Sequence, residues 1–257
     1  VCVGKAGVSM MLSGHRLTRL YVLDFGLFDV GPGQRTIGIP GFLLETDRGA
    51  RILFDTGFPP DYVTAPAATA ARDGLHRFGV FAQFGPQNTA AGQLSVLGLT
   101  PADITHVILS HGHIDHVGSL PLFAHARIIL TAVERADPRP CYFFDVQPYA
   151  WPDANYTQIT GETALCDGLT LIPTPGHTAG HLSAHLTLPD GRHVILAADA
   201  INRMSEADEG FADAKDPARA MESYHFLTDL ARQTGAEIIY GHEPNQWPAL
   251  PKAPLPY

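Results

Sequence analysis

The chain of 257 residues is 45% hydrophobic and 17% charged, with a mean hydropathy of +0.02, which is typical of a globular protein and excludes a disordered or fibrous one. Its formal net charge of −9 argues against a nucleic-acid partner, because no run of Lys and Arg offsets repulsion from the phosphates. No apolar run approaches the roughly 18 residues that span a bilayer, and residues 1–12 make a poor secretory signal. We therefore expect a cytoplasmic protein with no membrane partner.

The chain shows no internal repeat, low-complexity tract or charged linker, which favours a single domain over residues 1–257. Residues 1–18 are interpreted as an N-terminal extension of poor order. Cys2, Cys141 and Cys166 are odd in number and widely spaced, so they predict neither a disulfide framework nor a zinc site built on cysteines.

Strands and helices alternate along the chain, which predicts an α/β protein. Strands are expected at 20–25, 41–45 and 51–54, the last closed by a turn at 55–57. A helix is expected to start at 100–103 with Pro101 in its first position, followed by a buried strand at 104–109. Further strands are expected at 128–130, 169–172, 183–188, 194–197 and 237–240, and an amphipathic helix at 218–234.

Two segments rich in aromatic residues, 58–84 and 141–151, stand apart from this pattern. They could line or cover a pocket. The alternative is that both are insertions folded onto the core.

Segment 110–116 (SHGHIDH) places three imidazoles and a carboxylate directly after an apolar strand. Side chains two residues apart at a strand end point the same way, so His111 and His113 can converge on one ion. Asp115 and His116 would then turn toward another. Imidazole and carboxylate ligands without a thiolate suit Zn, Fe, Mn or Co.

Four further candidates lie later in the chain. In segment 174–181 (TPGHTAGH), glycines before each histidine allow sharp turns, and we expect His177 to be a metal ligand. His181 is interpreted as its hydrogen-bonded support, with a ligand role as the alternative. Asp199 ends an apolar strand, where a carboxylate is costly to bury without a cation, so a position bridging two ions would satisfy it. His242 follows another strand end, a ligand-like position.

Taken in order, 111–116, 176–177, Asp199 and 241–242 resemble the metallo-β-lactamase fold superfamily, and the likeness spans nearly the whole chain. The resemblance implies an αβ/βα four-layer sandwich. The Asp at 199 is similar to that of the dinuclear hydrolases, namely glyoxalase II, RNase Z and the N-acyl homoserine lactone lactonases. True zinc β-lactamases carry Cys there, and flavodiiron oxygen reductases differ around Asp115.

The resemblance further implies two divalent metal ions, for which we expect zinc, with iron, manganese or cobalt as alternatives. One ion would be held by His111, His113 and His177, the other by Asp115, His116 and His242, with Asp199 bridging the two. A hydroxide between the ions would attack an ester carbonyl, and Asp115 would be catalytic by passing a proton to the leaving alkoxide.

Among these branches the chain most resembles the lactonases, through residues 39–46, 49, 54–57, 199–200, 211–220 and 240–243. One position departs from that pattern. Lactonases of this family typically place a Tyr three residues after the bridging Asp to bind the substrate carbonyl, whereas this chain has Asn202. An amide can donate a hydrogen bond but supplies no phenol, so the sequence leaves open which lactone is opened.

We therefore predict a metal-dependent carboxylic ester hydrolase that opens a small-molecule lactone, with acyl homoserine lactones as the leading substrates. The alternative is an ester or thioester hydrolase of the glyoxalase II type. A phosphodiesterase, a redox-active iron protein and a metal-binding module without turnover are further hypotheses. Family precedent leaves monomer and homodimer open.

Overall fold

The structure is a computed structural model that describes residues 11–31, 35–140 and 146–257. Cys2 and Cys141 lie outside these residues, and Cys166 is a free, buried thiol. Of the predicted N-terminal extension, residues 1–10 also lie outside them. From residue 11 onward the chain packs on the fold: Leu12 is buried, and its N–H donates to the carbonyl of Leu165 at 2.9 Å.

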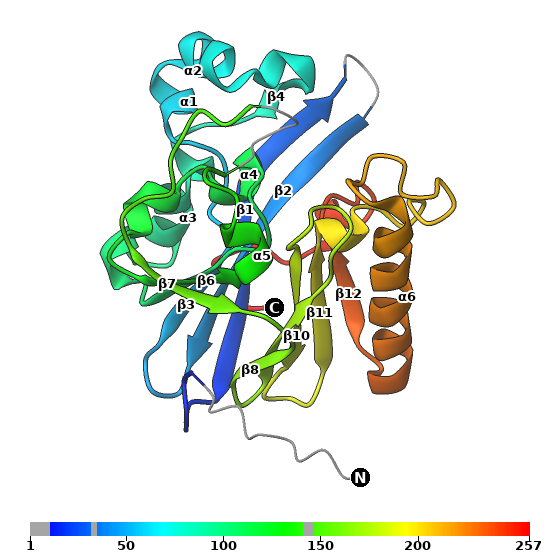
Figure 1. Cartoon of the computed structure of the whole chain (residues 1–257). Coiled ribbons are helices and arrows are strands. Elements are labelled where there is room, and N and C mark those ends of the chain that lie inside the picture. Colours follow the sequence, from blue (N-terminus) through cyan, green and yellow to red (C-terminus); the bar gives the residue numbers. More distant parts are fainter. Residues whose placement is uncertain (1–10, 32–34, 141–145) are drawn as a thin grey trace.

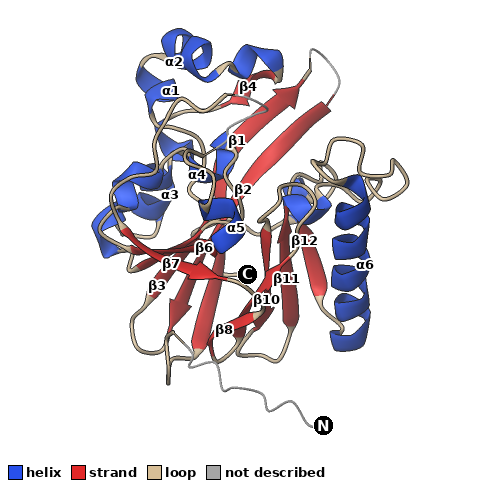
Figure 2. Ribbon diagram, viewed as in Figure 1, coloured by secondary structure: helices blue, strands red, loops and turns tan. Residues whose placement is uncertain are grey.

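The described residues form two β-sheets flanked by helices (Figures 1 and 2). The first sheet has the strand order β4-β1-β2-β3-β5-β6-β7 and the second the order β12-β11-β10-β9-β8. The strands of the first sheet are β1 (Leu17–Val30), β2 (Arg35–Thr46), β3 (Arg51–Phe54), β4 (Gly79–Gln83), β5 (His106–Ile108), β6 (Arg127–Thr131) and β7 (Asn155–Ile159). Those of the second are β8 (Thr163–Cys166), β9 (Leu169–Pro173), β10 (Leu182–Thr187), β11 (His193–Ala198) and β12 (Glu237–Tyr240). The α-helices are α1 (Asp61–Thr64), α2 (Pro66–Asp73), α3 (Ala90–Val96), α4 (Ile114–Val117), α5 (Ala132–Arg135) and α6 (Pro217–Thr234).

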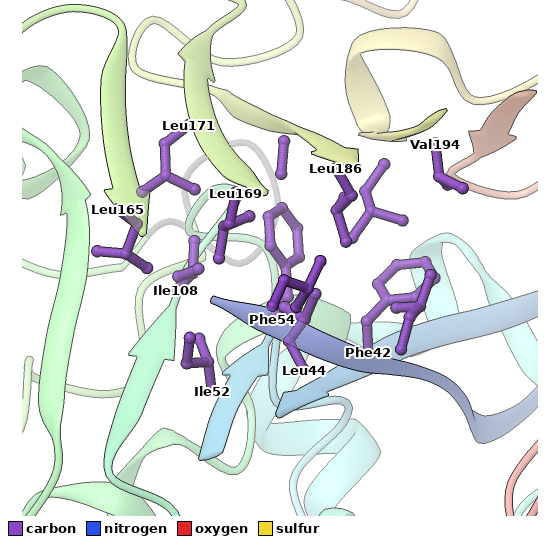
Figure 3. Close-up of a cluster of buried hydrophobic side chains, with 14 of the residues drawn as sticks. Phe42, Leu44, Ile52, Phe54, Ile108, Leu165, Leu169, Leu171, Leu186 and Val194 are labelled. Carbon is purple, nitrogen blue, oxygen red and sulfur yellow. The ribbon is translucent and has the colours of Figure 1, made fainter. Parts of the chain in front are cut away.

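The inner faces of the two sheets pack on each other through apolar side chains. Figure 3 shows Phe42 and Phe54 of the first sheet facing Leu171 and Leu186 of the second, in one buried cluster. Strand side chains alternate between faces, and the outer faces also carry buried apolar side chains, such as Leu43 and Leu53 of the first sheet and Ile195 of the second. Helix α6 covers the second sheet, and α3 packs with a separate cluster on the first. The predicted αβ/βα four-layer sandwich is confirmed.

Seven of the nine predicted strands have bounds within two residues of those in the structure. Strands β3 and β12 lie at the predicted residues, and α6 begins one residue earlier than expected, with the Asp216 side chain accepting from the N–H of Arg219. Strands β1 and β2 are longer than predicted. The predicted helix start at 100–103 is a single 3₁₀ turn, Pro101–Asp103, in which Asp103 accepts from the N–H of Thr100 at 2.8 Å.

The aromatic segment 58–84 is partly integrated into the core of the first sheet. Phe58 and Tyr62 are buried, and their rings lie 6.0 Å apart in an edge-on contact. Strand β4 extends the sheet by antiparallel pairing with β1. In the other segment, Trp151 is buried, whereas residues 141–145 lie outside the described residues. Of the two interpretations of these segments, the contacts of Phe58, Tyr62 and Trp151 therefore fit insertions folded onto the core.

Replacing Leu171 by alanine is expected to lower the free energy of unfolding by about 2–5 kcal/mol, because the truncation leaves a cavity between the two sheets. Leu171 is fully buried at their interface. Leu255→Ala is the matched control, since Leu255 is 63% exposed and its truncation should change stability by no more than about 0.5 kcal/mol. Urea unfolding of both variants measures the difference, and equal losses would contradict this account of the core.

Among the helices of the described residues, none is long and apolar enough to cross a membrane.

Candidate metal centre

The predicted metal ligands meet where several strands end. His111 lies three residues after β5, Asp199 directly follows β11, and His242 lies two residues after β12. The carboxyl ends of strands are where α/β folds commonly place ligand sites. His113 immediately precedes the short helix α4, which carries Asp115 and His116 on its first turn.

The structure brings all seven predicted ligands together in two neighbouring clusters. Within each cluster the candidate ligand atoms lie within 4.8 Å of one another. The first cluster consists of His111, His113, His177 and Asp199, and the second of Asp115, His116 and His242.

Asp199 faces both clusters, with one oxygen toward each. Its Oδ2 lies 3.2 Å from His177 Nε2 and 3.8 Å from His111 Nε2. Its Oδ1 lies 3.3 Å from Nε2 of both His116 and His242. This divided arrangement suits a carboxylate shared between two cations.

Gly241 allows the close approach of β12 to Asp199. A Cβ at this position would lie 2.9 Å from Asp199 Oδ1 and 2.6 Å from the carbonyl oxygen of Ala198. Ala198 itself has a φ of +45°, a left-handed conformation that alanine adopts only at a cost. The backbone at the end of β11 is thus bent to present the carboxylate, and only glycine fits beside it.

The second cluster is oriented by groups behind it. Asp55 Oδ2 lies 2.8 Å from His116 Nδ1, and His242 Nδ1 donates to the carbonyl of Gly38 at 3.0 Å. The same Asp55 oxygen accepts from Ser110 Oγ at 2.7 Å. With Nδ1 held from behind, both rings direct Nε2 toward the centre of the site, which is the usual arrangement of metal-binding histidines.

His181 lies behind Asp199. Its Nδ1 lies 2.9 Å from Thr174 Oγ1, and its Nε2 accepts the backbone N–H of Asp199 at 3.1 Å. Burial and the neighbouring His177 lower its pKa well below the usual value, which keeps the ring neutral. Both ring nitrogens are occupied, so this geometry favours the supporting role over a ligand role.

Asn202 is held by its own neighbours. Its backbone N–H and its side-chain Nδ2 both donate to Glu206, at 2.6 and 3.3 Å, and its carbonyl accepts from the N–H of His242 at 2.9 Å. Glu206 is buried. Asn202 is thereby fixed next to the second cluster rather than projecting freely like a surface amide.

The buried carboxylates of the site stabilise positive charge in their surroundings. Burial lowers the pKa of His242, but Asp199 and Asp115 outweigh burial and raise it to about 10. Burial opposes the ionisation of Asp199, yet His242, His116 and His177 hold its pKa well below the usual value. In the first cluster, burial and then His177 lower the pKa of His113 to about 3. The carboxylates are therefore ionised, and the histidines of the first cluster are neutral, as metal ligands must be.

The residues fit a pair of metal ions. His111 Nε2, His116 Nε2 and Asp199 Oδ1 are buried and make no hydrogen bond among the described residues. Buried polar atoms that lack a hydrogen-bond partner are costly in free energy, and these three all face the shared centre. Imidazole nitrogen and carboxylate oxygen are suitable donors for divalent transition metals.

Two supporting residues, Asp55 and Glu134, were not among the predicted site residues. Asp55 was interpreted only as part of a turn, although a carboxylate directly after a buried strand is a signal that could have revealed it. Glu134, whose side chain accepts from the N–H of Gly112, was not singled out either. The pattern Thr131-x-x-Glu134 is typical of a helix start, but it carries no information about the partner loops.

Fold and site together define a class: an α/β sandwich with two adjoining His/Asp clusters suited to a dinuclear metal centre. Residues 39–242 match the family model described as the metallo-beta-lactamase superfamily. The chain belongs to this superfamily.

Curated relatives are similar over most of their length. The chain is 30% identical to the N-acyl homoserine lactonase AttM of Azorhizobium caulinodans over 242 residues, which cover 85% of this chain and 86% of the relative. It is 32% identical to the N-acyl homoserine lactonase AiiA of Bacillus thuringiensis subsp. kurstaki over 218 residues, 80% of this chain and 81% of the relative.

Solved structures give the same likeness. An N-acyl homoserine lactone hydrolase with the product N-hexanoyl-L-homoserine bound at its catalytic metal centre has a TM-score of 0.79 and 25% identity, covering 94% of this chain and 100% of the other. AidC, a dizinc quorum-quenching lactonase, has a TM-score of 0.64 and 18% identity over 93% of this chain and 95% of the other, which is a likeness of fold.

Proposed function

We propose that this protein hydrolyses the ester bond of a lactone ring, with N-acyl homoserine lactones as the leading substrates, and so acts as a quorum-quenching enzyme. The observation that carries the proposal is the position of Asp199, whose two oxygens face two separate clusters of ligand atoms. The relatives named N-acyl homoserine lactonase support the substrate class. The net charge of −9 favours a small-molecule substrate over nucleic acid.

The two metal ions would be zinc, each held by three side chains besides the shared Asp199. His111, His113 and His177 would hold one ion, and Asp115, His116 and His242 the other. Nitrogen and oxygen donors without thiolate are consistent with zinc and also with iron, manganese or cobalt. When bound, such a pair supplies Lewis-acid polarisation of an ester carbonyl and a water molecule of lowered pKa.

Asp115 is placed to move a proton. Its Oδ2 lies 3.3 Å from His242 Nε2 and 3.5 Å from His116 Nε2, and its side chain remains 12% exposed, whereas that of His111 is fully buried. Its pKa is held below the usual value, because His116 and His242 outweigh the opposing effect of burial. The ionised carboxylate can take the proton released when water attacks the ester and pass it to the leaving alkoxide.

The experiment that tests this function compares two substrates on the same zinc-loaded protein. We expect ring opening of N-hexanoyl-L-homoserine lactone, followed by proton release with a pH indicator, to be faster than hydrolysis of a glutathione thioester, followed by thiol release. Metal content is quantified on the same sample. Faster thioester hydrolysis would instead favour the glyoxalase II-type alternative, and no turnover of either ester with two ions bound would leave a metal-binding module.

A further inference from the structure

Glu134 lies behind the first cluster, on the short helix α5, and its carboxylate contacts two loops at once. Its Oε1 accepts from the N–H of Gly112 at 2.8 Å. Its Oε2 accepts from Thr178 Oγ1 at 2.8 Å and from the N–H of Gly180 at 3.2 Å. The side chain is buried, so these bonds do not compete with bulk water.

The two loops joined by Glu134 carry the three histidines of the first cluster. Gly112 lies between His111 and His113, and Thr178 directly follows His177. His177 is more than sixty residues from His111 and His113 along the chain, and its Nε2 lies 3.0 Å from His113 Nδ1. The spacing of these rings therefore depends on how the two loops are held against each other.

Glu134 is itself fixed in place by Thr131, the residue at the start of α5. Thr131 Oγ1 accepts from the N–H of Glu134 at 3.1 Å and donates to the carbonyl of Gly180 at 2.6 Å. A Cβ at position 180 would lie 2.3 Å from Glu134 N, so the loop can approach α5 this closely only with glycine. The carboxylate thus belongs to a rigid connection between α5 and the His177 loop.

The second cluster is supported by other residues. His116 contacts Asp55, and His242 contacts the carbonyl of Gly38. Ser110 Oγ is shared, because it lies 3.0 Å from His111 Nδ1 and 3.2 Å from His116 Nδ1. The hydrogen bonds of Glu134, in contrast, go to Gly112, Thr178 and Gly180, beside the histidines of the first cluster.

We infer that Glu134 is a positioning residue for the metal ion of the first cluster, and that it sets how tightly this ion, rather than its neighbour, is held. The inference rests on the proposed dinuclear centre. Its chemical basis is that all three groups in contact with the Glu134 carboxylate are hydrogen-bond donors. The two oxygens of an ionised carboxylate can accept from all three. A glutamine of the same shape has one oxygen and one NH₂ group, so at least one N–H or O–H donor would face another donor.

The test is zinc retention by Glu134→Gln, measured by competition with a chromogenic chelator on the zinc-loaded protein. We expect one of the two zinc ions to be held about 10–100-fold more weakly than in the wild type, the usual effect of removing a partner behind a metal ligand, while the other is retained. Thr178→Val removes only one of the three donors and should weaken the same ion by a smaller factor. Glu222→Gln, at an exposed position on α6, is the matched control and should retain both ions.

Thermal unfolding of the zinc-free proteins separates a positioning role from a merely structural one. A merely structural role would lower the unfolding temperature of the metal-free variant and weaken the binding of both zinc ions alike. That result, or retention of both ions in Glu134→Gln and Thr178→Val as in the wild type, would overturn the inference. Should Glu134→Gln not fold, Thr178→Val decides. A wild type that binds two zinc ions but opens no lactone would refute the proposed function and leave this inference intact, whereas fewer than two ions in the wild type would refute both.

Discussion

Replacing Asp199 by alanine is expected to release bound metal from both clusters and to reduce lactone hydrolysis by more than about 100-fold, beyond the 10–100-fold that removal of an outer partner usually costs. The reason is its position, with Oδ2 toward His177 and Oδ1 toward His116 and His242. Without this carboxylate each cluster keeps three ligands, but the two cations lose the negative charge between them. Elemental analysis and turnover of N-hexanoyl-L-homoserine lactone measure the two effects on one sample.

The matched control for this variant is Asp208→Ala, which removes an exposed carboxylate nine residues further along the chain. It should retain metal and activity. An Asp199→Ala protein that still binds two ions at wild-type affinity would show that this carboxylate does not bridge them.

Replacing Asp115 by asparagine is expected to lower kcat by about 10²–10⁴-fold, the range that a general acid or base contributes, while KM changes little. An amide has nearly the same shape as the carboxylate and keeps an oxygen near His242, but it cannot carry a proton from the attacking water to the leaving alkoxide. The measurement is steady-state hydrolysis of the same lactone at saturating zinc.

Loss of metal is the competing explanation for a slow Asp115→Asn enzyme, because Asp115 also belongs to the second cluster. Zinc content at saturation is therefore measured alongside turnover. Wild-type kcat would refute the proton-transfer role. A fall in kcat that tracks the fraction of missing zinc would assign Asp115 to metal binding alone.

Local sequence determined the apolar elements and the ligand-rich motif. Strands β3 and β12 and helix α6 were predicted closely, because their apolar residues repeat with the period of the element and turn residues bound them. Segment 110–116 could be recognised for a similar reason: four potential ligands within one short stretch are close together whatever the rest of the fold does. Strands β4, β7 and β8 were missed. The side chains of β4 and β7 are largely half-buried or exposed, β8 has only four residues, and pairing with β1, β6 and β9 decides their conformation.

Only the tertiary structure decided how the distant residues of the site are arranged. The sequence could suggest that Asp199 bridges two ions, but not that each of its oxygens faces a different cluster. A carboxylate after a buried strand marks Asp55 as a candidate but does not indicate His116 as its partner, and nothing in the sequence indicates that Glu134 connects the loops of Gly112 and Thr178. These contacts join segments far apart in the chain, often through backbone N–H groups that every non-proline residue carries, so no residue type marks them in advance.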